Sequence, residues 1–371
     1  MTINTTVVIK ASPGFDVANE PPCESGLSRR VFLEKFSRHI GTGMLTSGCV
    51  LSGPGSTTAQ DVTSGMAHEE YAKHDAIGLS KLVREGSISS SELLEAAIQR
   101  LEVVNPKINA IAGRMYDEAR NAIRKGLPEG PFTGVPLPVK DISFSMRGVP
   151  AEYGSKLFAG RISKRDSTAI KRLRRSGCVL FARTHVPELG ISPTTESTFS
   201  GITRNPFSLD YTAGGSSGGS SAAVAAEIAP MATASDGGGS IRIPASCCGL
   251  FGLKPTRARV PIGPDGFEAW GGLAVLHGVT RSVRDSAALL DVMSGMALGD
   301  SYTAPYQDGN FLEQVTRNPG KLRIALVSTM RPTEHVDPEC LQAFQETARL
   351  CESLGHTIEE KTDDFNNQFS F

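Results

Sequence analysis

Residues 212–255 read TAGGSSGGSSAAVAAEIAPMATASDGGGSIRIPASCCGLFGLKP, which is the most informative part of the sequence. It contains two glycine-rich turns, 214–221 and 236–240, on either side of a run of small apolar residues at 222–228. Consecutive glycines let the backbone approach a ligand closely and leave several N–H groups free to point at one spot. An oxyanion hole needs such a group of donors. The stretch therefore predicts a site built from backbone N–H groups and serine hydroxyls.

Two other interpretations of the first glycine-rich turn remain open. Gly/Ser runs are commonly flexible linkers, but here an apolar helical run follows at once with no polar spacer. A phosphate-binding loop would need a Gly-Lys-Ser/Thr continuation, which this turn does not have. Both readings are weaker than that of a built site.

A second segment lies upstream, where residues 134–141 read GVPLPVKD. Lys140 follows an apolar, proline-rich strand pattern and precedes Asp141-Ile142, so burial of its side chain is expected. The alternative is an ordinary surface lysine.

Taken together, these residues resemble the amidase signature family. The pattern GGSSGGS…D-x-GGSIR-x-P…CG…GLKPT is matched across residues 212–255, and residues 134–141 are similar to the segment that bears the catalytic lysine of the family. The resemblance runs from about residue 70 to Phe371. It implies an α/β fold with a mixed, largely parallel sheet that is covered by helices on both faces.

The resemblance also implies a Ser–Ser–Lys catalytic set. Ser240 would be the nucleophile, Lys140 the neutral base, and Ser216 the bridge between them, with a cis peptide bond between Gly215 and Ser216. The expected oxyanion donors are the backbone N–H groups of Gly237, Gly238, Gly239 and Ser240. The residues expected to support this set by hydrogen bonding are Ser217, Ser235, Asp236 and Arg242.

Such a set implies hydrolysis of a carboxylic amide C–N bond through an acyl-enzyme, on a small molecule, with no metal or cofactor. Residues 254–261 and 299–302 are similar to the branch of the family that hydrolyses the cyclic dimer of 6-aminohexanoate. A subunit of a tRNA-dependent amidotransferase is a second hypothesis, although that branch commonly has Gln where this chain has Ile243. A truncated, inactive relative is a third.

The pattern outside the signature alternates strands with helices, which implies a largely parallel sheet with helices on both faces. Ser89 and Glu92 form a capping-box pattern, and the helix that follows is expected to end at Asn105-Pro106. Further helices are expected at 168–175 and 338–354, and strands at 178–182, 322–327 and 356–359.

The N-terminal region resembles an export leader. Residues 28–33 read SRRVFL, which is similar to a twin-arginine signal, and a weakly apolar segment follows. We therefore expect a leader over 1–64, a catalytic domain over 65–371, and export to the periplasm. Without export the protein would be cytoplasmic.

Composition limits the remaining possibilities. The chain has 371 residues and a net charge of −1, so it has no broad electrostatic attraction for nucleic acid. Its seven cysteines form no CxxC pair and no apolar run is long enough for a membrane span, so neither a metal site nor a spanning helix is expected. Family members continue well beyond the position of Phe371. A missing C-terminal part would expose a sheet edge, which a homodimer would cover.

Overall fold

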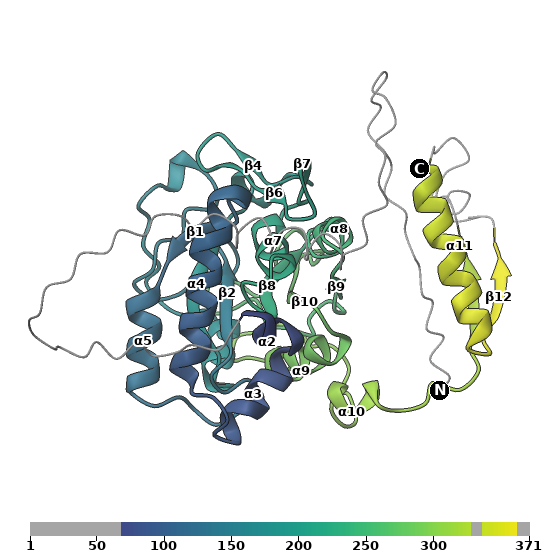
Figure 1. Cartoon of the computed structure of the whole chain (residues 1–371), viewed down its shortest axis with the longest axis horizontal. Helices are drawn as coiled ribbons and strands as arrows, with labels where there is room; N and C mark the ends of the chain where they lie inside the picture. The colour runs from purple at the N-terminus through teal and green to yellow at the C-terminus, as the bar shows by residue number, and fades with distance from the viewer. Residues whose placement is uncertain (1–67, 328–335, 362–371) are drawn as a thin grey trace, which may run out of the picture. The chain divides into compact units, whose positions relative to one another are not determined.

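The computed structural model describes residues 68–327 and 336–361 (Figure 1). The expected leader over 1–64, with its paired arginines, lies outside the described residues, so the leader and the export remain predictions. The chain divides into two compact units, one over 28–316 and one that contains 317–371. The predicted homodimer likewise remains a prediction.

The first unit contains the glycine-rich turns and Lys140. Its helices are α2 (His68–Lys73), α3 (Ala76–Arg84), α4 (Ser90–Ile108), α5 (Tyr116–Arg124), α6 (Thr168–Arg175), α7 (Gly218–Ala225), α8 (Arg242–Cys247), α9 (Val283–Met293) and α10 (Phe311–Val315), with 3-10 turns at Lys156–Phe158 and Glu188–Gly190. Its strands are β1 (Ile111–Arg114), β2 (Pro136–Lys140), β3 (Val179–Thr184), β4 (Glu196–Ser197), β5 (Gly201–Ile202), β6 (Arg204–Asn205), β7 (Ser208–Thr212), β8 (Met231–Asp236), β9 (Phe251–Gly252) and β10 (Val275–Thr280).

The second unit, described by itself, has one helix and two strands within 317–327 and 336–361. Strands β11 (Arg323–Leu326) and β12 (Thr357–Glu360) pair in parallel, and α11 (Pro338–Ser353) connects them. These elements lie within a residue or two of the expected ranges.

Helix α4 begins as its sequence predicts and ends later. The Ser89 hydroxyl accepts from the Glu92 N–H while the Glu92 carboxylate accepts from the Ser89 N–H, so the capping box is confirmed. The expected end at Asn105-Pro106 is wrong, because Pro106 lies in the last turn and the helix continues to Ile108. The buried Asn105 side chain accepts from the N–H groups of Ala110 and Ile111, so it directs the chain into β1 and fixes the end of the helix.

The sheet is mixed, as expected, but it is not largely parallel. Strands β1, β3 and β2 form one group and β8, β10 and β9 another (Figure 1), and the Lys140 N–H joins β2 to β8 by donating to Thr233 Oγ1 at 2.8 Å. Of the described strand pairs, β2–β3 and β11–β12 are parallel and five are antiparallel. Alternation of strands and helices predicted parallel pairing, but β10 is antiparallel to both β8 and β9, and antiparallel strands need no helical crossover.

The core surrounds α7, which consists of small residues. All eight of its residues are buried, and α7 packs against β2 and β8. A Cβ at Gly219 would lie 2.5 Å from the His185 backbone nitrogen, so the helix approaches β3 more closely than any larger residue would allow. Lys140 is one of the largest fully buried side chains, together with Tyr71, Phe132 and Phe181.

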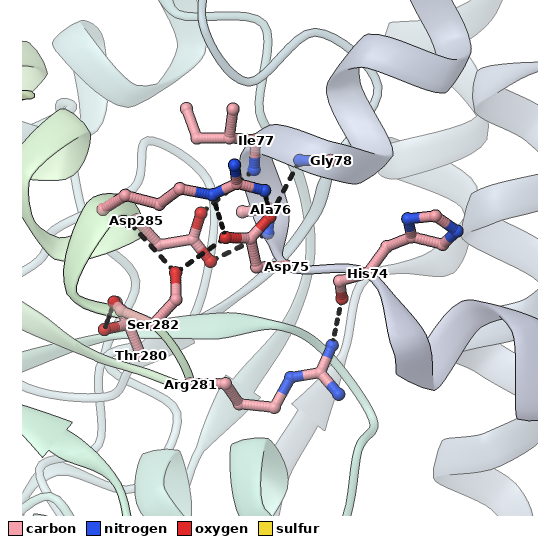
Figure 2. Close-up of polar contacts among 10 residues, drawn as sticks. His74, Asp75, Ala76, Ile77, Gly78, Thr280, Arg281, Ser282 and Asp285 are labelled. Carbon is pink, nitrogen blue, oxygen red and sulfur yellow. Dashed lines mark hydrogen bonds and ion pairs between the residues drawn. The ribbon is translucent and has the colours of Figure 1, made fainter. Parts of the chain in front are cut away.

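Asp75 and Asp285 join the starts of α3 and α9 by hydrogen bonds and an ion pair (Figure 2). The fully buried Asp285 carboxylate accepts from the N–H groups of Ala76 at 2.8 Å and Ile77 at 3.0 Å, the first two residues of α3. Asp75 caps α3 by accepting from the Gly78 N–H, and it also accepts from Ser282 Oγ at 2.8 Å and pairs with Arg284. Each helix thus supplies acceptors or donors to the start of the other.

We expect Asp285→Ala to destabilise the fold by about 2–4 kcal/mol, because two buried N–H groups of α3 lose their acceptor. Arg284→Ala is the matched control, since Arg284 is 52% exposed and an exposed ion pair contributes less than about 1 kcal/mol. Urea unfolding followed by circular dichroism measures both. Equal losses for the two variants would contradict this account of the Asp285 carboxylate.

Candidate active site

Lys140 lies at the end of β2 with only 1% of its surface exposed. Its Nζ lies 2.9 Å from Ser216 Oγ, 2.7 Å from Ser217 Oγ and 2.9 Å from Ser235 Oγ. These hydroxyls come from the turn before α7 and from β8. Three segments that are distant in the sequence therefore converge on one amine.

Burial lowers the pKa of Lys140 to about 7, and the negative charge of Asp236 opposes this shift. The cause is desolvation, which penalises the ammonium form more than the neutral amine. A substantial fraction of Lys140 is therefore neutral near pH 7 and can accept a proton.

The turn before α7 is fixed by its neighbours. The Gly215–Ser216 peptide bond is cis, as expected. A Cβ at Gly215 would lie 2.6 Å from the Thr194 carbonyl oxygen, so only glycine fits there. Thr195 Oγ1 accepts from the Gly218 N–H at 3.1 Å and donates to the Gly214 carbonyl at 2.9 Å, which holds both ends of the turn.

The second glycine turn wraps around the Asp236 carboxylate. Asp236 is fully buried and accepts from the N–H groups of Gly239 at 2.8 Å and Ile241 at 3.2 Å. The Arg242 guanidinium adds two bonds of 2.9 and 3.0 Å. Burial by itself would raise the pKa of Asp236, but these donors and the Arg242 charge outweigh it and hold the pKa below its usual value.

This arrangement changes the expected set of oxyanion donors. Among the described residues the N–H groups of Gly237, Gly238 and Ser240 have no acceptor, whereas that of Gly239 already donates to Asp236. The Ser240 side chain is half-buried and makes no hydrogen bond to any described residue. The predicted link from Ser240 to Ser216 is therefore not present as a hydrogen bond, although catalytic contacts often tighten only around a bound substrate.

Comparison with known proteins identifies the family of the chain. The Amidase family pattern matches residues 92–369, which is most of the chain. The chain belongs to the amidase signature family. It is 41% identical over 293 residues to the 6-aminohexanoate-cyclic-dimer hydrolase of Paenarthrobacter ureafaciens, an alignment that covers 77% of this chain and 59% of that relative.

Solved structures of the amidase signature family give the same result. The structure of a 6-aminohexanoate cyclic dimer hydrolase complexed with substrate matches with a TM-score of 0.74 and 40% identity, over 78% of this chain and 60% of that one. A bacterial aryl acylamidase of the family matches with a TM-score of 0.71 and 31% identity, over 78% and 61%. The chain thus spans about three fifths of the length of these relatives.

Of the residues expected from the amidase signature, the structure brings Lys140, Ser216, Ser217 and Ser235 into direct contact. It places Asp236 and Arg242 in a separate ion pair that shapes the glycine turn. Within 68–327 and 336–361, no group of three or more His, Cys, Asp or Glu side chains could hold a metal ion, and no helix is long and apolar enough to cross a bilayer.

Two features of this amidase-family site were not expected from the sequence. One is Thr233, whose hydroxyl binds the Lys140 N–H and which alternation along β8 could have indicated. The other is a buried cluster next to Lys140, in which Asp141 pairs with Arg183 at 2.5 Å and Arg183 also binds Glu152 at 3.2 Å. Burial raises the pKa of Asp141 to about 6, and the Arg183 charge opposes this.

We expect Asp236→Ala to lose about 3–5 kcal/mol of stability, because it leaves several N–H groups and a guanidinium without their common acceptor. Arg242→Ala should cost about 1 kcal/mol, since that side chain is 51% exposed and water can replace it. Hydrogen exchange at Gly239 and Ile241 separates the two, because only Asp236→Ala removes the acceptor. Unchanged protection in Asp236→Ala would show that the carboxylate does not hold the turn.

Proposed function

We propose that this chain is a serine amidase that hydrolyses a small carboxylic amide through an acyl-enzyme on Ser240. The observation that carries the proposal is the buried Lys140 amine 2.9 Å from Ser216 Oγ, with a pKa of about 7. A serine hydroxyl is a weak nucleophile at its ordinary pKa and needs such a base.

The hydrogen bonds around Lys140 indicate which groups donate to its amine and which accept from it. Ser217 Oγ donates to the Ser235 carbonyl at 3.3 Å, so it accepts from the amine. A neutral amine has two N–H groups and one lone pair. With the N–H groups directed to Ser217 and Ser235, the lone pair faces Ser216, whose hydroxyl then donates to Lys140.

The reaction follows from this orientation. Ser216 passes its proton to Lys140 and takes the proton of Ser240, whose oxygen forms a bond to the amide carbon. The N–H groups of Gly237, Gly238 and Ser240 donate to the oxyanion. Each such donor lowers the activation free energy by on the order of 3 kcal/mol. The proton returns through Ser216 to the amide nitrogen as the C–N bond breaks, and water then hydrolyses the ester at Ser240 with the same base.

The similarity to 6-aminohexanoate-cyclic-dimer hydrolases favours a small aliphatic amide as substrate. The apolar Ile243 beside the glycine turn is less suited to the amidotransferase alternative. An inactive relative is the third reading, and the labelling experiment below separates it from an active enzyme.

We expect the full chain to react with a fluorophosphonate probe and Ser240→Ala to be unlabelled. Lys140→Ala should label at least about 100-fold more slowly, the usual range for loss of a general base. The matched control is Ser221→Ala in the same Gly/Ser segment, because Ser221 Oγ is buried without a hydrogen-bond partner. Labelling that survives in Ser240→Ala, or a folded parent that never labels, would reject the proposal and favour the inactive relative.

We also expect kcat/KM for amide hydrolysis to rise about tenfold per pH unit below a pKa of about 7 and to level off above it, because only neutral Lys140 accepts the proton. Burial lowers the pKa values of His185 to about 4 and of His277 to about 3, so neither contributes between pH 5.5 and 9. A profile that is flat over this range would contradict the role of Lys140.

A further inference from the structure

The register of β8 and β10 places a second loop beside the glycine turn. Asp236, the last residue of β8, pairs with Val275, the first residue of β10, and the two strands are antiparallel. The turn at 237–240 leaves this end of the sheet, and the turn at 269–274 enters it. Residues of the two turns are therefore neighbours.

Trp270 lies over Gly237. A Cβ at Gly237 would lie 2.8 Å from Trp270 Cε3 and 3.1 Å from Cζ3, so the indole rests on the glycine where any side chain would displace it. Gly237 carries one of the N–H groups without an acceptor among the described residues. The indole thus borders the proposed oxyanion site.

The backbone of Trp270 is strained, and its side chain is 55% exposed. Its φ of +56° is in the left-handed region, which bulky residues rarely occupy, and its carbonyl accepts from the Leu273 N–H at 3.2 Å. Burial of the indole does not account for this backbone, since more than half of the side chain faces out. Strained residues of this kind are concentrated at ligand sites.

The other sides of the glycine turn are apolar at Gly239 and open at Gly238. A Cβ at Gly239 would lie 2.7 Å from Ile243 Cδ1, whereas one at Gly238 would meet nothing within 4 Å. The turn is therefore open at Gly238 and apolar on both flanks. The nearby Arg242 charge is already paired with Asp236.

We propose that Trp270 is a substrate-binding residue, whose indole takes the uncharged aliphatic acyl chain of an amide held at Gly237 and Gly238. This rests on the proposed function, because the same turn must hold the carbonyl oxygen. The exposed indole face and the Ile243 methyl group offer contacts to methylene groups, and they offer no partner to a charged chain end, which would lose hydration there.

Trp270 is the single tryptophan of the chain, so its emission reports directly on this contact. The experiment titrates the full-length Ser240→Ala variant, which cannot form an acyl-enzyme, with hexanamide. The matched ligand is adipamate, a chain of the same length that ends in a carboxylate. We expect a saturable change in emission with hexanamide and at least about tenfold weaker binding of adipamate, because its charge must be desolvated.

Kinetics of the active chain provide a second measurement. Trp270→Ala should raise KM for hexanamide about tenfold with little change in kcat, the size of effect that one apolar contact has on specificity, and Trp270→Phe should raise it less. Phe267→Ala, an exposed aromatic of the same loop, is the control and should leave KM unchanged. Equal effects of Trp270→Ala and Phe267→Ala would overturn the proposal in favour of general loop damage.

The two measurements separate this proposal from the proposed function. An emission change in Ser240→Ala, together with a parent that hydrolyses no amide, would support the role of Trp270 and refute the amidase. Hydrolysis of hexanamide without any emission change would refute the role of Trp270 and leave the amidase standing. Equal binding of adipamate would overturn the preference for uncharged chains.

Discussion

The site depends on the burial of one amine. Taking a lysine ammonium out of water is unfavourable unless a charge or several hydrogen bonds compensate it. Among the described residues Lys140 has no ion pair with a carboxylate, and three serine hydroxyls surround its Nζ instead. Hydroxyls can either donate or accept, so they suit a neutral amine, and the same packing that buries Lys140 lowers its pKa.

Asp236 is also a buried ionisable group, but it stays charged. It is as deeply buried as Lys140, but backbone N–H groups and the Arg242 guanidinium surround it, so it stays charged. Its charge organises the glycine turn and also limits how far the pKa of Lys140 falls. The charges of the two buried groups are therefore coupled: Lys140 can be neutral near pH 7, whereas Asp236 stays charged and holds the backbone of the turn.

The strands β2, β8 and β10 connect Lys140 and Asp236 to the glycine turn and to Trp270. The Lys140 N–H binds Thr233 of β8, and β8 continues through Ser235 and Asp236 into the glycine turn. The antiparallel register of β8 and β10 then brings Trp270 over Gly237. A parallel arrangement, which alternation of strands and helices favoured, would place the start of β10 at the other end of β8 and leave this flank of the turn without an indole.

The family, the local elements and most of the residues at the site could be predicted from the sequence. Ser89 with Glu92 specifies the start of α4, and the glycine and serine spacing over 212–255 specifies the turns, because caps and tight turns depend on residues close in the chain. The strand directions, the Gly239 bond to Asp236, the contacts of Thr233 and Arg183, and the position of Trp270 became visible only in the folded structure. These depend on sheet register and on burial, which bring together residues far apart in the sequence and set the pKa of Lys140.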